Sequence, residues 1–151
     1  MDGTGSLFVG RAGTLERDGN WVGFGVTDLA LSLAPVPDSV PTARHELDGL
    51  ADRLDQGRLD KLRLLVSEVV SNGVRHGEGD GPIQLRIAVG RSAVRVEVED
   101  PGHGFRPSRE TGPVGRYDGW GLLLVERLAD RWGVVASGST LVWFELDGPH
   151  R

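Results

Sequence analysis

The feature that most constrains the fold of this chain is a pair of short segments in which apolar and polar residues alternate. Apolar residues stand at every second position in residues 83–89, and residues 94–98 repeat the pattern after a turn at 90–92. Alternation with a period of two places one set of side chains on a single sheet face, and two such runs joined by a short turn are typical of an antiparallel hairpin. The chain therefore contains a sheet with one apolar face, which a second layer must cover.

Segments with helical periodicity are predicted to form that second layer. Apolar residues recur at helical spacing from Val40 to Leu54 and again from about Leu59 to Arg75, and a leucine-rich helix is expected from about Gly121 to Trp132. We expect Ser39 to cap the first helix and Gly133 to end the last. Three helical segments are thus available to cover the sheet.

Two further strand segments complete the predicted order of elements. Residues 29–33 alternate and precede two prolines, which is typical of an edge strand, and residues 134–136 and 141–146 are expected to form a second hairpin across 138–140. The order strand, helices, hairpin, helix, hairpin predicts an α+β two-layer sandwich with the helices on one face of the sheet.

Length and composition indicate one domain, residues 27–151, preceded by a glycine-rich N-terminal extension, residues 1–26. The chain of 151 residues is long enough to bury a core, and its lack of cysteine excludes disulfides and thiolate–metal sites. A net charge of −5 argues against direct nucleic-acid binding. Because no apolar run has membrane-spanning length and no signal pattern is present, we expect a cytoplasmic protein without a membrane partner.

The first candidate site is a line of polar residues on the second helix. Glu68, Asn72 and His76 are spaced one helical turn apart, so their side chains fall on one line beside the apolar face marked by Leu65 and Val69. A carboxylate and a carboxamide at the edge of a core can orient a hydroxyl or water and bind a hard cation through oxygen. The same spacing also fits a solvated helix flank, and this alternative stays open.

The second candidate is Asp100, which directly follows the strand at 94–98. Strand parity places Asp100 on the same face as the buried valines, where a carboxylate needs a hydrogen-bond donor. An exocyclic amino group such as that of adenine satisfies this need. The same carboxylate selects against a base with a carbonyl at that position, because a carbonyl cannot donate. Gly102 and Gly104 then allow close approach to a flat ring or phosphates. An ordinary Asp-Pro-Gly turn is the competing interpretation.

Two glycine-containing segments follow. Gly119 and Gly121 open the third predicted helix at Leu122, where free backbone N–H groups can bind phosphate, and residues 112–116 are placed to close over it as a lid. No P-loop motif is present. Residues 138–140 are interpreted mainly as a hairpin turn. A hydroxyl directed at a nucleotide is the less favoured interpretation.

These four features occur in the same order in the GHKL ATPase family: Glu-x-x-x-Asn on a helix, Asp-x-Gly-x-Gly after a strand, Gly-x-Gly opening a helix, and a late Gly-Thr-like turn. Residues 65–77 resemble the asparagine helix of that family. The resemblance extends through residues 39–44, 132–134 and 142–144, covers about 29–147, and is strongest to the RsbW-like anti-sigma serine kinases of actinobacteria. It implies a Bergerat-type ATP-binding fold with a mixed, mainly antiparallel sheet.

The resemblance also implies ligands and residue roles. ATP and Mg²⁺ are the expected cofactors, with Glu68 as general base, Asn72 as the Mg²⁺ ligand and Asp100 on the adenine amino group. The remaining expected nucleotide contacts are Gly102, Gly104, Gly119, Gly121, Leu122 and Thr140. Gly73, Trp120 and Ser139 depart from the usual Ala, Arg and Lys of the group, and Arg116 is a candidate replacement for the missing Arg.

The implied function is that of an anti-sigma factor serine/threonine kinase. Its expected partners are a sigma factor, a STAS-domain anti-anti-sigma protein, or both, and a homodimer is also compatible with the resemblance. Two alternatives stay open: a module that sequesters its partner without phosphoryl transfer, and an ATPase without a protein acceptor.

Overall fold

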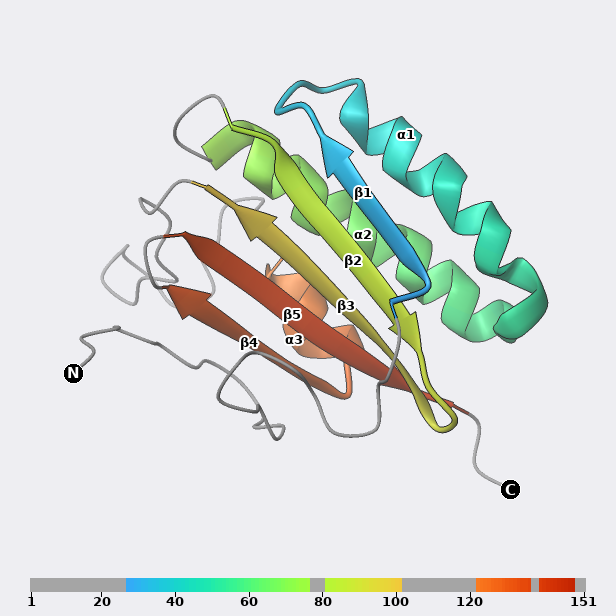
Figure 1. Cartoon of the computed structure of the whole chain (residues 1–151). Coiled ribbons are helices and arrows are strands. Elements are labelled where there is room, and N and C mark those ends of the chain that lie inside the picture. Colours follow the sequence, from blue (N-terminus) through green and yellow to red (C-terminus); the bar gives the residue numbers. More distant parts are fainter. Residues whose placement is uncertain (1–26, 77–80, 102–121, 137–138, 149–151) are drawn as a thin grey trace.

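The computed structural model describes residues 27–76, 81–101, 122–136 and 139–148, and the fold is described within these ranges. Figure 1 shows a sheet with its helices packed behind it. Along the chain the elements are β1 (Leu29–Leu33), α1 (Ser39–Glu46), the 3-10 helix η1 (Leu47–Arg53), α2 (Gln56–His76), β2 (Ile83–Val89), β3 (Ala93–Asp100), α3 (Leu122–Leu128), β4 (Arg131–Ala136) and β5 (Thr140–Asp147).

The sheet has five strands in the order β1-β2-β3-β5-β4. Every pair of neighbouring strands in the described part of the chain is antiparallel, so the expectation of a mixed sheet is corrected there. The physical reason is the position of β5, which lies between β3 and β4. The strands β3 and β4 run in the same direction, but they are not neighbours, so no parallel pair forms.

The core lies between the sheet and the helices, all of which cover the same sheet face (Figure 1). The alternating residues of β2 and β3 face the helices as the period of two predicts. The central buried residues from the two layers are Leu62, Leu65, Val66, Val70, Ile83, Leu85, Ile87, Val94, Val96 and Val98. The predicted α+β two-layer sandwich with helices on one face is confirmed.

The start of the first helix differs from the prediction. Asp38, not Ser39, occupies the N-cap position, and the Ser39 hydroxyl donates a hydrogen bond to the Ala34 carbonyl at 2.6 Å. The predicted cap was therefore wrong, because the hydroxyl bonds back to the loop that precedes the helix. The helical periodicity to Leu54 is divided between α1 and η1, and Leu47 and Leu50 remain buried in the 3-10 segment.

The second helix begins at Gln56, three residues before the predicted start, because Asp55 caps it. Asp55 Oδ2 accepts the backbone N–H of Arg58 at 3.0 Å, and Oδ1 accepts Arg58 Nε at 2.7 Å. These hydrogen bonds, the one from the Arg58 side chain first, lower the pKa of Asp55. Residues 55–58, which lie between the two predicted helical segments, therefore initiate the second helix.

The third helix is shorter than predicted. It ends at Leu128, and both Trp132 and Gly133 belong to β4. The backbone N–H of Asp130 donates to the Glu145 carbonyl at 2.9 Å, so the chain joins the sheet at this point. Arg131 pairs with Glu145 and Asp147 of β5, and the hydrogen bonds, the one to Asp147 first, raise the pKa of its guanidinium. Pairing with β5 therefore ends the helical region.

Candidate functional site

The ends of three elements meet at one end of the sheet. The last turns of α2, the end of β3 and the start of β5 lie together there (Figure 1). Asp100, the last residue of β3, stands directly opposite Thr140, the first residue of β5. The antiparallel register thus brings together two predicted site residues that are forty positions apart in the sequence.

The carboxylate of Asp100 faces the helix layer, as strand parity predicts. A Cβ built at Gly73 of α2 would lie 3.6 Å from Asp100 Oδ2 and 3.1 Å from Cδ1 of Ile83. Asp100 is partly buried, whereas the following Pro101 is exposed. The glycine therefore lets the helix backbone approach the carboxylate closely, and Asp100 faces the interior between the two layers.

Asn72 lies one residue before this contact and is 5% exposed. No described residue donates a hydrogen bond to its buried Oδ1. A buried carbonyl oxygen without a donor is unfavourable, so this atom is suited to a cation or a ligand donor. An amide oxygen is a hard ligand of the type that Mg²⁺ binds, so the residue present fits the implied metal.

Glu68 lies one turn before Asn72 and is partly buried. Its neighbour Ser67 is buried and has a structural task, because its hydroxyl donates to the Arg63 carbonyl at 2.7 Å and accepts from Arg44 Nε at 3.0 Å. The contact between Arg44 and Ser67 joins α1 to α2 and orients the helix that carries Glu68. The side chain of His76 lies outside the described residues.

Thr140 and Leu122 are both buried, at 3% and 0% exposure. Leu122 is the first residue of α3 and belongs to the core. The other predicted contacts, Gly102, Gly104, Gly119 and Gly121, lie outside the described residues, as do the expected lid at 112–116 and Gly138. The structure therefore brings together Gly73, Asp100 and Thr140, and Asn72 precedes Gly73 on α2.

Sequence reasoning did not single out Glu99, which neighbours Asp100 on the opposite sheet face. Glu99 Oε2 accepts a hydrogen bond from the Ser139 hydroxyl at 2.8 Å. The alternation of Arg95, Glu97 and Glu99 along β3 was the available signal, because these three residues share the face away from the helices. The partner of Glu99, Ser139, directly precedes β5 and was not predictable without the strand order.

Within the described ranges, no three His, Cys, Asp or Glu side chains gather as a multi-ligand metal site requires. Asn72 is therefore the residue on which the fit to a cation rests here. None of the described helices combines the length and apolar character needed to cross a membrane.

The arrangement agrees with a comparison to protein families. Residues 33–144 match the sequence model of the histidine kinase-like ATPase domain. The chain belongs to this family. The matched region contains Glu68, Asn72, Asp100 and Thr140, whereas residues 1–26 lie before it. Membership in the histidine kinase-like ATPase family indicates ATP binding and a regulatory function with possible ATP-dependent kinase activity. No curated protein matches the chain.

Proposed function

We propose that this histidine kinase-like ATPase domain is a cytoplasmic anti-sigma factor serine/threonine kinase, which transfers the γ-phosphoryl group of ATP to a STAS-type partner. The observation that carries the proposal is the close approach of the Asp100 carboxylate to Gly73, where a Cβ would lie 3.6 Å from Oδ2. The preceding residue, Asn72, has a buried Oδ1 that accepts no hydrogen bond from a described residue. A carboxylate and a carboxamide oxygen thus lie at the same end of one sandwich, as recognition of a base and a cation requires.

Asp100 recognises the adenine. Its carboxylate accepts hydrogen bonds only, so it favours a base with an exocyclic amino group and disfavours guanine, which has a carbonyl at the corresponding position. The glycine at 73 keeps space beside the carboxylate, because a longer side chain there would meet Ile83 and Asp100. Thr140 supports the same pocket from β5, where it stands opposite Asp100.

Asn72 holds the cation through its amide oxygen. When bound, Mg²⁺ neutralises charge on the phosphates of the nucleotide. The buried position of Asn72, at 5% exposure, keeps its side chain in one place, since a packed side chain has few alternative rotamers. The residue thereby orients the phosphates relative to the helix that carries Glu68.

Glu68 acts as general base toward the acceptor hydroxyl. The hydroxyl oxygen of a Ser or Thr forms a bond to the γ-phosphorus, the bond from that phosphorus to the β,γ-bridging oxygen breaks, and ADP leaves. The hydroxyl proton passes to the Glu68 carboxylate. Its position one helical turn before Asn72 places the base on the same line of α2 as the cation ligand.

Two measurements on the full chain test the proposal. Calorimetry is expected to detect Mg-ATP binding and much weaker Mg-GTP binding, because guanine has a carbonyl, which cannot donate to Asp100, where adenine has its amino group. Incubation with ATP labelled at the γ-phosphate and a purified cognate STAS protein is expected to label a Ser or Thr of that protein. Absence of ATP binding, or equal affinity for both nucleotides, would contradict the assigned pocket.

A second candidate function is an ATP-binding module that sequesters a sigma factor or its antagonist without phosphoryl transfer. It is favoured by Ser139, which stands where related kinases often carry Lys and directs its hydroxyl to Glu99 on the outer sheet face. This position therefore supplies no cation to the phosphates. Retained ATP binding without label transfer to the cognate partner would select this second function.

A further inference from the structure

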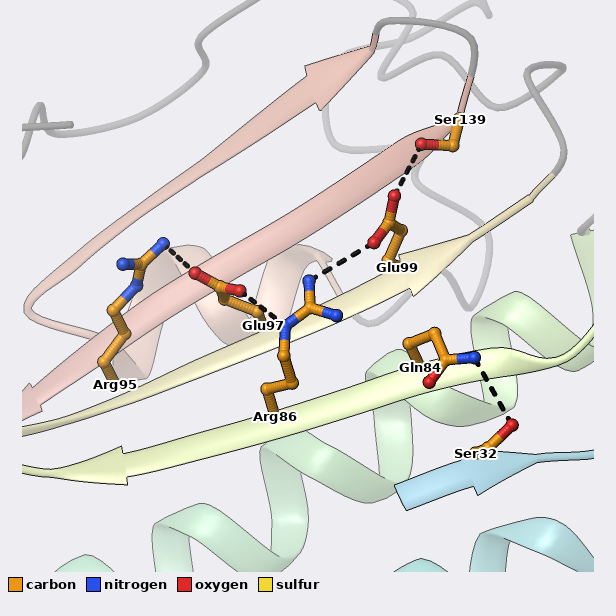
Figure 2. Close-up of polar contacts among 7 residues, drawn as sticks. All are labelled: Ser32, Gln84, Arg86, Arg95, Glu97, Glu99 and Ser139. Atoms are coloured by element: carbon orange, nitrogen blue, oxygen red, sulfur yellow. Dashed lines mark hydrogen bonds and ion pairs between the residues drawn. The ribbon is translucent and has the colours of Figure 1, made fainter. Parts of the chain in front are cut away.

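A chain of alternating charges crosses the outer face of the sheet, the face away from the helices (Figure 2). Arg95 pairs with Glu97, and Glu97 Oε1 accepts Arg86 Nε at 3.0 Å. Arg86 Nη2 donates to Glu99 Oε1 at 3.2 Å. Glu99 Oε2 accepts the Ser139 hydroxyl at 2.8 Å, so the chain of contacts ends at the residue that precedes β5.

At its other end the network begins at a buried arginine on the same outer face. The Arg95 side chain is 5% exposed, and its guanidinium lies 5.8 Å from the ring centroid of the fully buried Trp143. Burial lowers the pKa of Arg95 to about 10, so the guanidinium is still charged at neutral pH. Exposure rises along the chain to 36% at Glu99. A fixed cation at one end thus orients a series of side chains that leads to the site.

The last hydrogen bond connects the two strands on which the candidate nucleotide site depends. Successive residues of a strand face opposite sides of the sheet, so Glu99 and Ser139 lie on the outer side while Asp100 faces α2. Each partner of the hydrogen bond is the sequence neighbour of a site residue, Asp100 or Thr140. One contact on the outer face therefore restrains both site residues on the inner one.

We propose that Ser139 and Glu99 form a latch that holds the start of β5 against the end of β3 and thereby positions Asp100 and Thr140 for nucleotide binding. This inference rests on the proposed nucleotide site. Both latch residues are positioning residues, because they act through their neighbours and do not face the pocket. The latch contributes little to global stability, since hydrogen bonds and ion pairs at partly exposed positions have small net effects.

The chain offers a matched control for the latch. Gln84 Nε2 donates to the Ser32 hydroxyl at 3.3 Å, also on the outer face but between β1 and β2 (Figure 2). Ser32→Ala and Ser139→Ala each remove one hydroxyl that bonds to a side chain on a neighbouring strand. Only Ser139→Ala touches the strands that carry the site.

The test measures Mg-ATP affinity of the full-length variants by calorimetry. Ser139→Ala is expected to raise the Kd for ATP about three- to tenfold, which corresponds to the net loss of one typical, partly exposed hydrogen bond. Ser139→Thr, which keeps the hydroxyl, and Ser32→Ala are both expected to stay within about twofold of the wild type. Both alanine variants should shift the thermal unfolding midpoint by similarly small amounts. Unchanged affinity in Ser139→Ala, or an equal loss in Ser32→Ala, would overturn the latch.

Amide hydrogen exchange separates failure of the latch from failure of the proposed function. Peptides that contain the end of β3 and the start of β5 are expected to exchange faster in Ser139→Ala than in the wild type, with or without nucleotide. If the wild type binds no ATP, the proposed function is wrong and the exchange data still decide whether Ser139 holds the strand ends together. Unchanged exchange would overturn the latch in either case.

Discussion

The backbone of Gly73 in α2 lies against the carboxylate of Asp100 at the end of β3, with 3.6 Å between a Cβ built at Gly73 and Asp100 Oδ2. This relationship joins the helix layer to the sheet at the candidate site. Two motifs that are separate in the sequence thus share one local environment. The size of residue 73 therefore controls the space beside the carboxylate.

Substitutions of Gly73 are predicted to affect the stability of the fold and the affinity for ATP to different extents. Gly73→Ala should change the free energy of unfolding by less than about 1 kcal/mol, because the higher helix propensity of Ala offsets the 3.1 Å contact with Ile83. Gly73→Val should weaken ATP binding about tenfold or more, since its additional methyl groups crowd Ile83 and Asp100. Chemical denaturation and calorimetry measure the two effects. ATP affinity of Gly73→Val equal to that of Gly73→Ala would contradict the predicted crowding.

Asp100→Asn and Glu68→Ala are predicted to affect different steps. Asp100→Asn should weaken ATP binding by about ten- to a hundredfold, because the carboxamide is uncharged and replaces one of the two acceptor oxygens by a donor. Glu68→Ala should keep ATP affinity within about threefold and lower the rate of phosphoryl transfer by about 10² to 10⁴. Calorimetry and labelled-phosphate transfer to the partner provide the two readouts. Equal losses of binding in both variants would show that the roles are wrongly assigned.

Gly133 in β4 is predicted to be the glycine with the strictest packing requirement among those described. A Cβ there would lie 2.7 Å from Nε1 and 2.9 Å from Cε2 of the buried Trp143. Gly133→Ala should therefore lower the free energy of unfolding by about 1–3 kcal/mol through overpacking. Gly49→Ala is the matched control, because no atom lies within 4 Å of a Cβ at that position. Equal unfolding midpoints for the two variants would refute the packing argument.

Asp28 is predicted to contribute stability that depends on pH. Its Oδ1 pairs with Arg53 Nη1 at 2.6 Å and its Oδ2 accepts the Val89 N–H at 2.7 Å. These contacts, the Arg53 hydrogen bond first, lower the pKa of the carboxyl group in the folded state. The stabilisation is therefore fully present above the unfolded-state pKa of about 3.9 and is lost as the pH falls through the lower folded-state value.

Asp28→Asn is accordingly expected to lower the free energy of unfolding by about 1–2 kcal/mol at pH 7, and the difference from the wild type should shrink below about pH 4. Urea titrations across this pH range measure it. Asp52→Asn removes an exposed carboxylate from η1 as a control and should have little effect at either pH. A difference that stays constant from pH 7 to pH 3 would rule out the charged carboxylate as its source.

Local periodicity was sufficient to predict most of the layer structure. The alternation in β2 and β3 identified the hairpin and its buried face, and helical spacing identified α2 with Glu68 and Asn72 on one line. These predictions succeeded because periods of 2 and 3.6 are properties of neighbouring residues. Strand parity likewise predicted that Asp100 faces inward, as its contact distance to Gly73 confirms.

The boundary between α3 and β4 could not be predicted in this way. The leucine-rich pattern suggested a helix to Trp132, but the chain leaves the helix at Leu128 because Asp130 bonds to Glu145 and Arg131 pairs with β5. Those partners lie about fifteen positions later in the sequence, on the second strand of the final hairpin. A helical pattern carries no information about a competing strand partner.

The sequence by itself determined the type and order of the main elements and the buried faces of β2, β3 and α2, because these depend on short-range side-chain order. Tertiary structure alone decided that β5 lies between β3 and β4. That strand order places Thr140 opposite Asp100 and Ser139 beside Glu99, since contacts between distant segments follow from how the layers pack and not from local periodicity.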